Sequence, residues 1–421
     1  MKQGIKFGWS AAIVFIWLFS VLFSTRVSAA PRFAAVPSVS INAPGQIFIG
    51  SSFSFTVTFD NTGADTGYGP YLDVFLPLSG ADGIVGGPND GISFSAASYL
   101  GAPVTTQTLN CPAGSTVTHP LTNQTVTCPP QPAGLFSPFV WQMVVVTLPF
   151  GSFVPGQPPI EVAVNAQLSN YADLNVPLPI WAGGGFMFGQ DPLNNPASDP
   201  PISAARVQTS PNPTAALITL SKAYSGPEDE TATGPNFPRR YTLTATIAAG
   251  QTLSNFVLSD SLPGNMQFVS LVSTSPGGAS CSLPSTSTPG GSISCSFVSI
   301  SGSVSLTFEF FIPLRDANGN LILDPDTGND ETSCNNTAAS GDWTPLDPRD
   351  SLTTITQNPA GCEHTLTDKS IAIQKGVANL SASPLSPGDV LEYTLDIQIS
   401  DFFVFDQVVV TDVLSDGQRW D

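Results

Sequence analysis

Hydrophobic and polar residues alternate with a period of two in three segments of similar composition. These are SFTVTF at 54–59, RYTLTATI at 240–247 and EYTLDIQI at 392–399, each with an aromatic residue followed by threonine. Aromatic and β-branched residues in strict alternation are typical of strands buried on one face. Outside the N-terminal segment, no window has sustained helical periodicity. The pattern predicts an all-β protein.

The three segments also share the spacing to a second strand. A leucine follows each aromatic residue after 21 positions, and a turn comes next. The pairs are Phe55 with Leu76, Tyr241 with Leu262, and Tyr393 with Leu414. A shared offset indicates three copies of one unit. The copies begin 186 and 152 residues apart (241 − 55 and 393 − 241), which suits tandem β-sandwich domains rather than a short solenoid repeat.

The N-terminus has the pattern of an export signal. Lys2 and Lys6 precede an apolar run at 8–23, and Val27 and Ala29 supply small residues for cleavage after Ala29. The alternative is a retained membrane anchor, but the run is shorter than the ~20 residues that a span needs. The resulting domain prediction is a signal peptide at 1–29, a divergent sandwich at 30–195, a Pro/Ser/Ala-rich linker at 196–217, a second sandwich at 218–368 and a third at 369–421. Since the third copy has too few strands for a sandwich, we expect it to be incomplete and the chain to be part of a longer protein.

Charge and cysteine content narrow the class of protein. The 32 acidic residues exceed the 13 basic ones, for a net charge of −19, which argues against nucleic-acid binding. An even number of cysteines in an exported chain indicates disulfides. Their spacing favours three sequential pairs: Cys111–Cys128, Cys281–Cys295 and Cys334–Cys362.

An aspartate interrupts the apolar row of the segment FVLSDSLPGNMQF at 256–268. Asp260 falls in line with the apolar residues, and Asp412 holds the same position in the third copy. Lysines stand at matching places upstream of both, Lys222 and Lys375. The first copy has Val74 at the aspartate position and no matching lysine. A carboxylate that faces a core must be paired, hydrogen-bonded or neutral, so we expect each lysine to contact its aspartate.

These strings resemble a known type of bacterial repeat. "YTLTATI…FVLSDSLPGN" and "GDVLEYTLDIQI…VVVTDVLSDG" are similar to the bacterial surface repeat catalogued as domain of unknown function eleven, and to isopeptide-forming fimbrial domains. The resemblance covers 218–340 and 371–417 and is weaker in the first copy. It implies tandem immunoglobulin-like sandwiches, and a bond from Lys222 to Asn336 or the neighbouring Asn335, assisted by Asp260. The alternative is an ion pair without a bond, or an aspartate that caps the turn.

Two other features of the sequence could carry chemistry. The acid-rich segment 315–331 offers Asp316, Asn318, Asp324 and Asp326 as oxygen ligands for calcium. The dipeptide Asn318-Gly319 favours a hairpin turn there instead. The histidines, His119 and His364, fall in no catalytic motif, and we expect His119 in a surface loop.

We therefore expect a non-enzymatic scaffold, secreted or on the cell surface, with a structural or adhesive role. It would need no cofactor, apart from the calcium alternative. Its partners would be other surface proteins or an extracellular ligand, with no nucleic acid and no membrane span in the mature fragment. Two alternatives remain: the first copy binds a glycan or protein, or the copies are spacers of a larger extracellular hydrolase.

Overall fold

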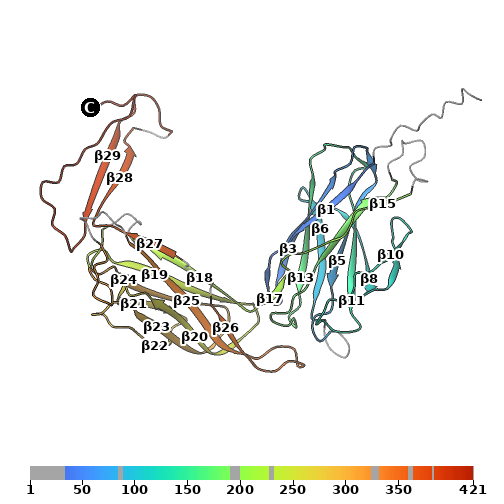
Figure 1. The fold of residues 1–421 in the computed structure, drawn as a ribbon, viewed down its shortest axis with the longest axis horizontal. Coiled ribbons are helices and arrows are strands. Elements are labelled where there is room, and N and C mark those ends of the chain that lie inside the picture. The colour runs from blue at the N-terminus through green and yellow to red at the C-terminus, as the bar shows by residue number, and fades with distance from the viewer. Residues whose placement is uncertain are drawn as a thin grey trace, which may run out of the picture.

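The structure is a computed structural model that describes residues 34–83, 89–189, 200–226, 232–323, 331–358, 364–381 and 384–420. All regular elements in these ranges are β-strands, as the alternation predicts. They form two β-sandwiches, which are the arms of a wide V, and a C-terminal hairpin beyond the second sandwich (Figure 1). The all-β prediction is confirmed.

The first sandwich has two main sheets and three small strand pairs. One sheet has the order β1 (Pro37–Asn42), β3 (Ser52–Asn61), β13 (Ile160–Leu168), β6 (Ile92–Tyr99), β7 (Ala102–Pro103). The other has the order β15 (Ile202–Ser203), β14 (Trp181–Phe186), β5 (Pro70–Pro77), β11 (Val140–Thr147), β8 (Thr105–Pro112), with β16 (Val207–Gln208) also on β14. The small pairs are β9 (Thr116–Thr118) with β10 (Thr125–Thr127), β4 (Gly67–Tyr68) with β12 (Ser152–Phe153), and β2 (Gln46–Phe48) with β17 (Thr214–Ala216).

The second sandwich repeats this arrangement. Its first sheet has the order β18 (Ile218–Ser225), β19 (Arg239–Ile247), β24 (Ser303–Phe311), β21 (Gln267–Ser275). Its second has the order β22 (Ser280–Ser282), β23 (Gly291–Ile300), β20 (Leu253–Leu262), β25 (Glu331–Trp343), β26 (Thr353–Gln357), with β27 (His364–Asp368) also on β25.

Strand order relates the two sandwiches element by element. The order β1-β3-β13-β6 corresponds to β18-β19-β24-β21, and β14-β5-β11-β8 corresponds to β25-β20-β23-β22. Corresponding strands also follow one another in the same chain order. Two sandwiches with weak sequence likeness therefore share one topology, in agreement with the repeat seen in the sequence.

Alternation along β20 shows how the core is built. Phe256, Leu258 and Leu262 are each less than 5% exposed, whereas Ser261, on the opposite face, is exposed. Successive side chains of a strand point to opposite faces, so one row packs against the facing sheet. Asp260 belongs to the inward row and is 1% exposed. The sequence placed this carboxylate in the core, and the structure finds it there.

The segment expected to be a linker, 196–217, does not behave as one in its described part. Its strands β15 and β16 pair with β14, and β17 pairs in parallel with β2. Ala216 ends β17 and Ile218 begins β18, so Leu217 alone joins the sandwiches. Pairing of these short strands satisfies their backbone groups and completes the first sandwich. The linker prediction is corrected in this respect.

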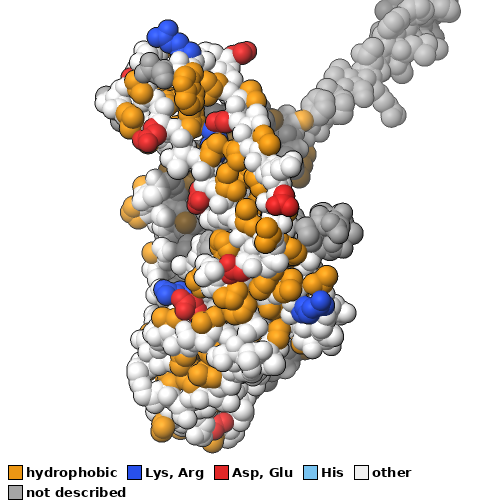
Figure 2. Space-filling view, turned by 90° about the vertical axis from the view of Figure 1, so that its left-hand side faces the viewer, with side chains coloured by type: hydrophobic (Ala, Val, Ile, Leu, Met, Phe, Trp, Pro, Cys, Tyr) orange, Lys and Arg blue, Asp and Glu red, His pale blue; other side chains and the backbone are white. Residues whose placement is uncertain are grey.

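The C-terminal hairpin consists of β28 (Ile371–Asn379) and β29 (Leu391–Ile399), which pair with each other. Asp401 anchors it to the second sandwich by accepting hydrogen bonds from Asn236. Figure 2 shows hydrophobic side chains on the surface of the region with this hairpin, at the top of the view. The exposed apolar residues of β28 and of the segment after β29 include Val377, Val404 and Trp420, which are 62%, 93% and 88% exposed.

Residues 1–33, which include the predicted signal peptide, lie outside the described residues. Within the described ranges, no helix is long and apolar enough to cross a membrane.

Candidate functional site

The lysine and aspartate singled out in the sequence meet in the core of the second sandwich. Lys222 lies on β18 in one sheet, and Asp260 lies on β20 in the other. Lys222 Nζ is 2.9 Å from Asp260 Oδ2, and both side chains are fully buried. The pair therefore spans the two sheets and lies out of contact with bulk water.

Asn335 on β25 completes the cluster. Lys222 Nζ donates to Asn335 Oδ1 at 2.6 Å and to its backbone carbonyl at 3.3 Å. Asn335 Nδ2 donates to Asp260 Oδ1 at 2.5 Å, while Thr337 Oγ1 donates to Asp260 Oδ2 at 3.2 Å. Both carboxylate oxygens are thus hydrogen-bonded, as a buried carboxylate requires.

An aromatic wall encloses the lysine. Lys222 Nζ lies 5.0 Å from the centroid of the Tyr241 ring, and Tyr241 stacks on Phe310 at 4.8 Å. A cation above an aromatic face gains electrostatic stabilisation that increases when water is excluded. The aromatic residue that marks the repeat in the sequence therefore forms part of this site.

Asn336, named first as the amide partner, lies outside the cluster. It is exposed and pairs with Ser261 on the outer face of the sheet. Asn335 is 1% exposed and takes the inward place instead. Neighbouring residues of a strand face opposite ways, so only one of the two asparagines can reach Lys222. The sequence contained a signal for the choice: Asn335 is in register with Trp343, the large apolar residue that ends β25.

The third copy forms the same pair in a more open setting. Lys375 Nζ is 2.7 Å from Asp412 Oδ1, and it lies 4.4 Å from the centroid of the Tyr393 ring. The lysine and aspartate side chains are 39% and 28% exposed. Lysine, aspartate and tyrosine thus recur together in both copies that contain the lysine.

The first sandwich has an apolar residue at every position of the cluster. Ile41 pairs with Val57 as Lys222 pairs with Leu243, so Ile41 corresponds to Lys222. Ala182 pairs with Val74 as Thr337 pairs with Asp260, so Val74 corresponds to Asp260 and Ala182 to Thr337. By the same registers Ile180 corresponds to Asn335. Val74, Ile180 and Ala182 are fully buried. The polar cluster is therefore an addition to a fold that forms without it.

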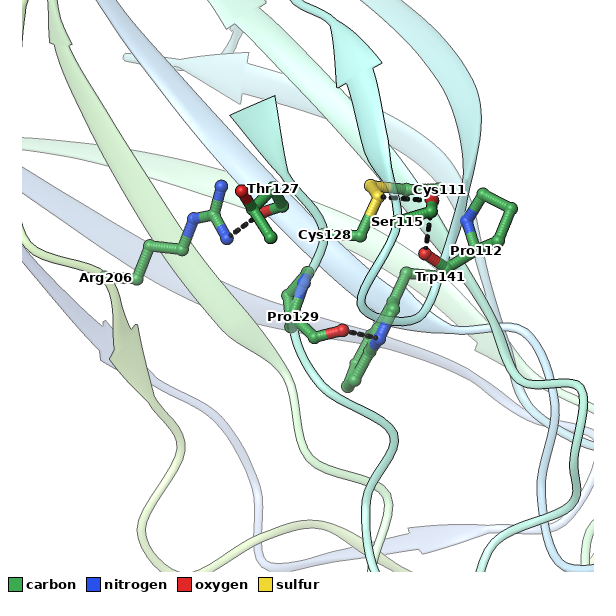
Figure 3. The surroundings of a disulfide bond; sticks show 8 residues. All are labelled: Cys111, Pro112, Ser115, Thr127, Cys128, Pro129, Trp141 and Arg206. Carbon is green, nitrogen blue, oxygen red and sulfur yellow. Dashed lines mark hydrogen bonds between the residues drawn. A yellow bond between two sulfur atoms is a disulfide. The ribbon is translucent and has the colours of Figure 1, made fainter. Parts of the chain in front are cut away.

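Disulfides reinforce both sandwiches. Cys111–Cys128 and Cys281–Cys295 are bonded. Figure 3 shows Cys111–Cys128 with its surroundings, where Trp141 Nε1 donates to the Pro129 carbonyl at 3.1 Å and Arg206 donates to the Thr127 carbonyl at 2.6 Å. The third predicted pair, Cys334–Cys362, lies outside the residues whose side chains are described.

The acidic segment forms a turn where it is described. Asp316 Oδ1 accepts hydrogen bonds from the backbone N–H groups of Asn318 and Asn320. Gly319 has a φ of 88°, which favours glycine. These bonds use the Asp316 carboxylate for the turn itself, as the Asn318-Gly319 motif predicts. The calcium alternative stays untested, because Asp324 and Asp326 lie outside the described residues.

The expectation of a surface position for His119 is wrong. His119 is fully buried, and its Nε2 lies 2.9 Å from Asp73 Oδ1. Its Nδ1 accepts from the backbone N–H groups of Leu121 and Thr122. The histidine therefore fixes the β9–β10 hairpin to Asp73 of β5. With both ring nitrogens bonded, it has a structural role.

Comparisons with known proteins give no relative by sequence. No family model matches the chain, and no curated protein matches it. The resemblance to the surface repeat therefore remains a prediction.

Solved structures give several matches at low identity. One is AvmM, which catalyses macrocyclisation in alchivemycin A biosynthesis, at 13% identity over 42% of this chain and 86% of that chain, with a TM-score of 0.24. Another is a variant of BcpA, the major pilin subunit of Bacillus cereus, at 8% identity over 56% and 73%, with a TM-score of 0.23. The full-length major pilin SpaD of Corynebacterium diphtheriae matches at 12% over 76% and 65%, with a TM-score of 0.25. The fold assignment rests on this chain's own strand order.

Proposed function

We propose that the protein is a non-enzymatic structural scaffold of the cell exterior, whose second sandwich is closed by an isopeptide bond between Lys222 and Asn335. The observation that carries the proposal is the buried contact of 2.6 Å between Lys222 Nζ and Asn335 Oδ1, with Asp260 bonded to both side chains. A protein that works as a stalk must resist unfolding. A cross-link between the two sheets serves that purpose.

The arrangement supplies what the reaction requires. Asp260 takes a proton from the Lys222 ammonium, and the neutral amine attacks Cγ of Asn335. As the Cγ–Nδ2 bond breaks, Asp260 passes this proton to the leaving nitrogen and takes a second proton from the attacking nitrogen, so that ammonia departs and Asp260 ends protonated. The product is a secondary amide, and the net change is the loss of one ammonia. Asp260 already contacts both the attacking amine and the leaving amide, so no rearrangement of the core is needed.

Burial also favours this chemistry over a permanent ion pair. Taking two charges out of water costs several kcal/mol per ion, which their attraction only partly offsets. Conversion to an amide removes both the ammonium charge and the need to solvate it. The apolar residues at the same positions of the first sandwich show that the fold needs no ion pair there.

Intact-mass spectrometry of the reduced protein tests the bond. Wild type should be about 17 Da lighter than its sequence, since ammonia has a mass of about 17 Da and is lost when the amide forms. Asn335→Ala should restore the full mass of its own sequence. Asn336→Ala is the matched control, because this neighbour points to solvent, and it should keep the deficit. A wild-type mass without the deficit would contradict the proposal.

A peptide map gives the second readout. Proteolysis of wild type should yield one branched peptide that joins the segments around Lys222 and Asn335. Asp260→Asn should leave these segments separate, because the side chain that accepts the proton is gone. If Asp260→Asn forms the bond as fully as wild type, the role given to this carboxylate is wrong.

A further inference from the structure

The junction between the two sandwiches gathers an unusual amount of like charge. Besides the joint at Leu217, described contacts between the sandwiches come from Asp82 after β5, from Asp173 after β13 and from the loop 344–352 after β25. The titratable groups that face one another there, among the described residues, are Asp82, Asp90 and Asp173 of the first sandwich and Asp347, Arg349 and Asp350 of the second. Five carboxyl groups and one guanidinium therefore gather at the junction.

Arg349 makes the direct contact across the junction. Its Nε lies 3.0 Å from Asp82 Oδ2, and its Nη1 donates to the backbone carbonyls of Asp82 and Gly83, at 3.2 Å in the first case. The same guanidinium bonds Asp347 of its own loop, with Nε 2.8 Å from Asp347 Oδ1. The Arg349 charge is thus shared between Asp347 of its own sandwich and Asp82 of the other.

Three of the carboxyl groups, Asp82 among them, also lie close to one another. One carboxylate oxygen from each of Asp82, Asp173 and Asp350 lies within 4.8 Å of the other two. Asp173 and Asp350 also line a cleft of about 380 Å³ between the sandwiches, together with Trp343. Asp90 beneath them is fully buried and accepts from the backbone N–H groups of Gly80 and Gly83. Like charges at this distance repel strongly when they are partly desolvated.

We propose that this junction is an acid-stabilised latch, which holds the two sandwiches docked at mildly acidic pH and releases them to move about Leu217 as the pH rises. When protonated, the carboxyl groups on the two sides of the junction are uncharged and can donate hydrogen bonds to one another. When ionised, they repel one another and drive the loops apart. The joint between the sandwiches is a single residue, so release frees a hinge without unfolding either sandwich.

The titration of these groups supports the direction of the switch. Desolvation, followed by the nearby Asp90, Asp173 and Asp347, raises the pKa of Asp82 to about 7 from 3.8. Desolvation raises the pKa of Asp173 to about 6, with Asp350 of the other sandwich adding to the effect. Desolvation and Asp347 also raise the pKa of Asp350.

The raised pKa values set the direction in which docking depends on pH. Separation of the sandwiches returns these groups toward water, so the docked state binds more protons than the released state. Docking is then strongest below the ordinary carboxyl pKa and weakens as the pH rises from about 4 to about 7. The ion pair of Arg349 with Asp82 acts in the opposite sense. This effect is the weaker one. Desolvation and the nearby carboxylates raise the pKa of Asp82 by more than Arg349 lowers it.

Interdomain distances by pulsed electron spin resonance test the latch in the full chain. Spin labels on Leu100→Cys and Val298→Cys, both more than 85% exposed, report the distance between the sandwiches. The distribution should be narrow at pH 5 and at least twofold broader at pH 8. All samples contain a chelator, so that a divalent cation cannot replace the protons.

Neutral variants separate the latch from a general effect of pH. Asp82→Asn with Asp173→Asn should keep the distribution narrow at both pH values. Glu161→Gln, an exposed acid on β13, should respond as wild type does. Circular dichroism at both pH values verifies that each variant is folded. Equal widths for wild type at pH 5 and pH 8, or an unchanged response in the Asp82/Asp173 variant, would overturn the proposal.

Discussion

At the scale of single residues, the second sandwich buries a charged pair where the first sandwich has apolar residues. Lys222 and Asp260 are fully buried, and each contacts the other and Asn335. At the corresponding positions the first sandwich has apolar residues, namely Ile41, Val74, Ile180 and Ala182. Breaking a buried pair leaves an uncompensated charge, whereas replacing all of it by apolar residues often has little effect.

This contrast predicts the stability of two variants. Lys222→Ile alone and the fourfold variant that adds Asp260→Val, Asn335→Ile and Thr337→Ala, which copies the first sandwich, both lack the bond. The free energy of unfolding of the second sandwich should be about 3–5 kcal/mol higher in the fourfold variant, because the single variant leaves the Asp260 carboxylate buried without a cation. Urea unfolding followed by fluorescence measures both. Equal stability of the single and fourfold variants would argue that the charge is not desolvated.

The sequence allowed much of this site to be predicted, for a physical reason. Asp260 and Lys222 each stand out because a charge in an apolar row needs a partner. The choice between Asn335 and Asn336 depends on which face of β25 is inward. Trp343 indicates that face, because burial alternates regularly along β25 from Asn335 to Trp343. His119 could not be placed, because the hairpin that carries it folds over a sheet far away in sequence.

At the scale of elements, the disulfides staple neighbouring strands. Cys281–Cys295 joins β22 to β23, and the two cysteines are separated by 14 residues. Alternating patterns predicted the strands, and sequential spacing predicted two bonds that the structure contains. The edge strands β15, β16 and β17 escaped prediction, since strands of two or three residues are set by their partners and not by a pattern of their own.

Removal of one disulfide gives a test at this scale. Replacing Cys281 and Cys295 by alanine should lower the free energy of unfolding of the second sandwich by about 3 kcal/mol in the chain-entropy account. Urea midpoints of the variant and of the reduced wild type should both fall below the oxidised wild type. A midpoint equal to the oxidised protein would show that β22 adds little to the sandwich. In the oxidised Cys281/Cys295 variant, the first sandwich keeps its own disulfide and serves as the internal reference.

At the scale of the whole molecule, the arrangement depends on the single joint at Leu217 and on the loops around it. Tandem organisation follows from the repeat spacing, so the sequence predicted two complete sandwiches and a shorter third copy. Their mutual placement could not be predicted, because it rests on Arg349 reaching Asp82, a contact between residues more than 260 positions apart. Because the residues of the acidic junction lie far apart in the chain, no local sequence pattern predicts it.

The position of Lys222 and Asn335 on the first and last long strands of their sandwich has a mechanical consequence. Tension applied through the chain ends enters at β18 and leaves beyond β27, which follows β25 and β26. An amide between Lys222 and Asn335 would carry the load past the 113 positions between them. About 400 Å of extended chain would then never be released, at ~3.5 Å per residue. In single-molecule pulling, wild type should lack this length and Asn335→Ala should regain it. The sandwich would act as a fixed-length segment in a chain that otherwise yields to force.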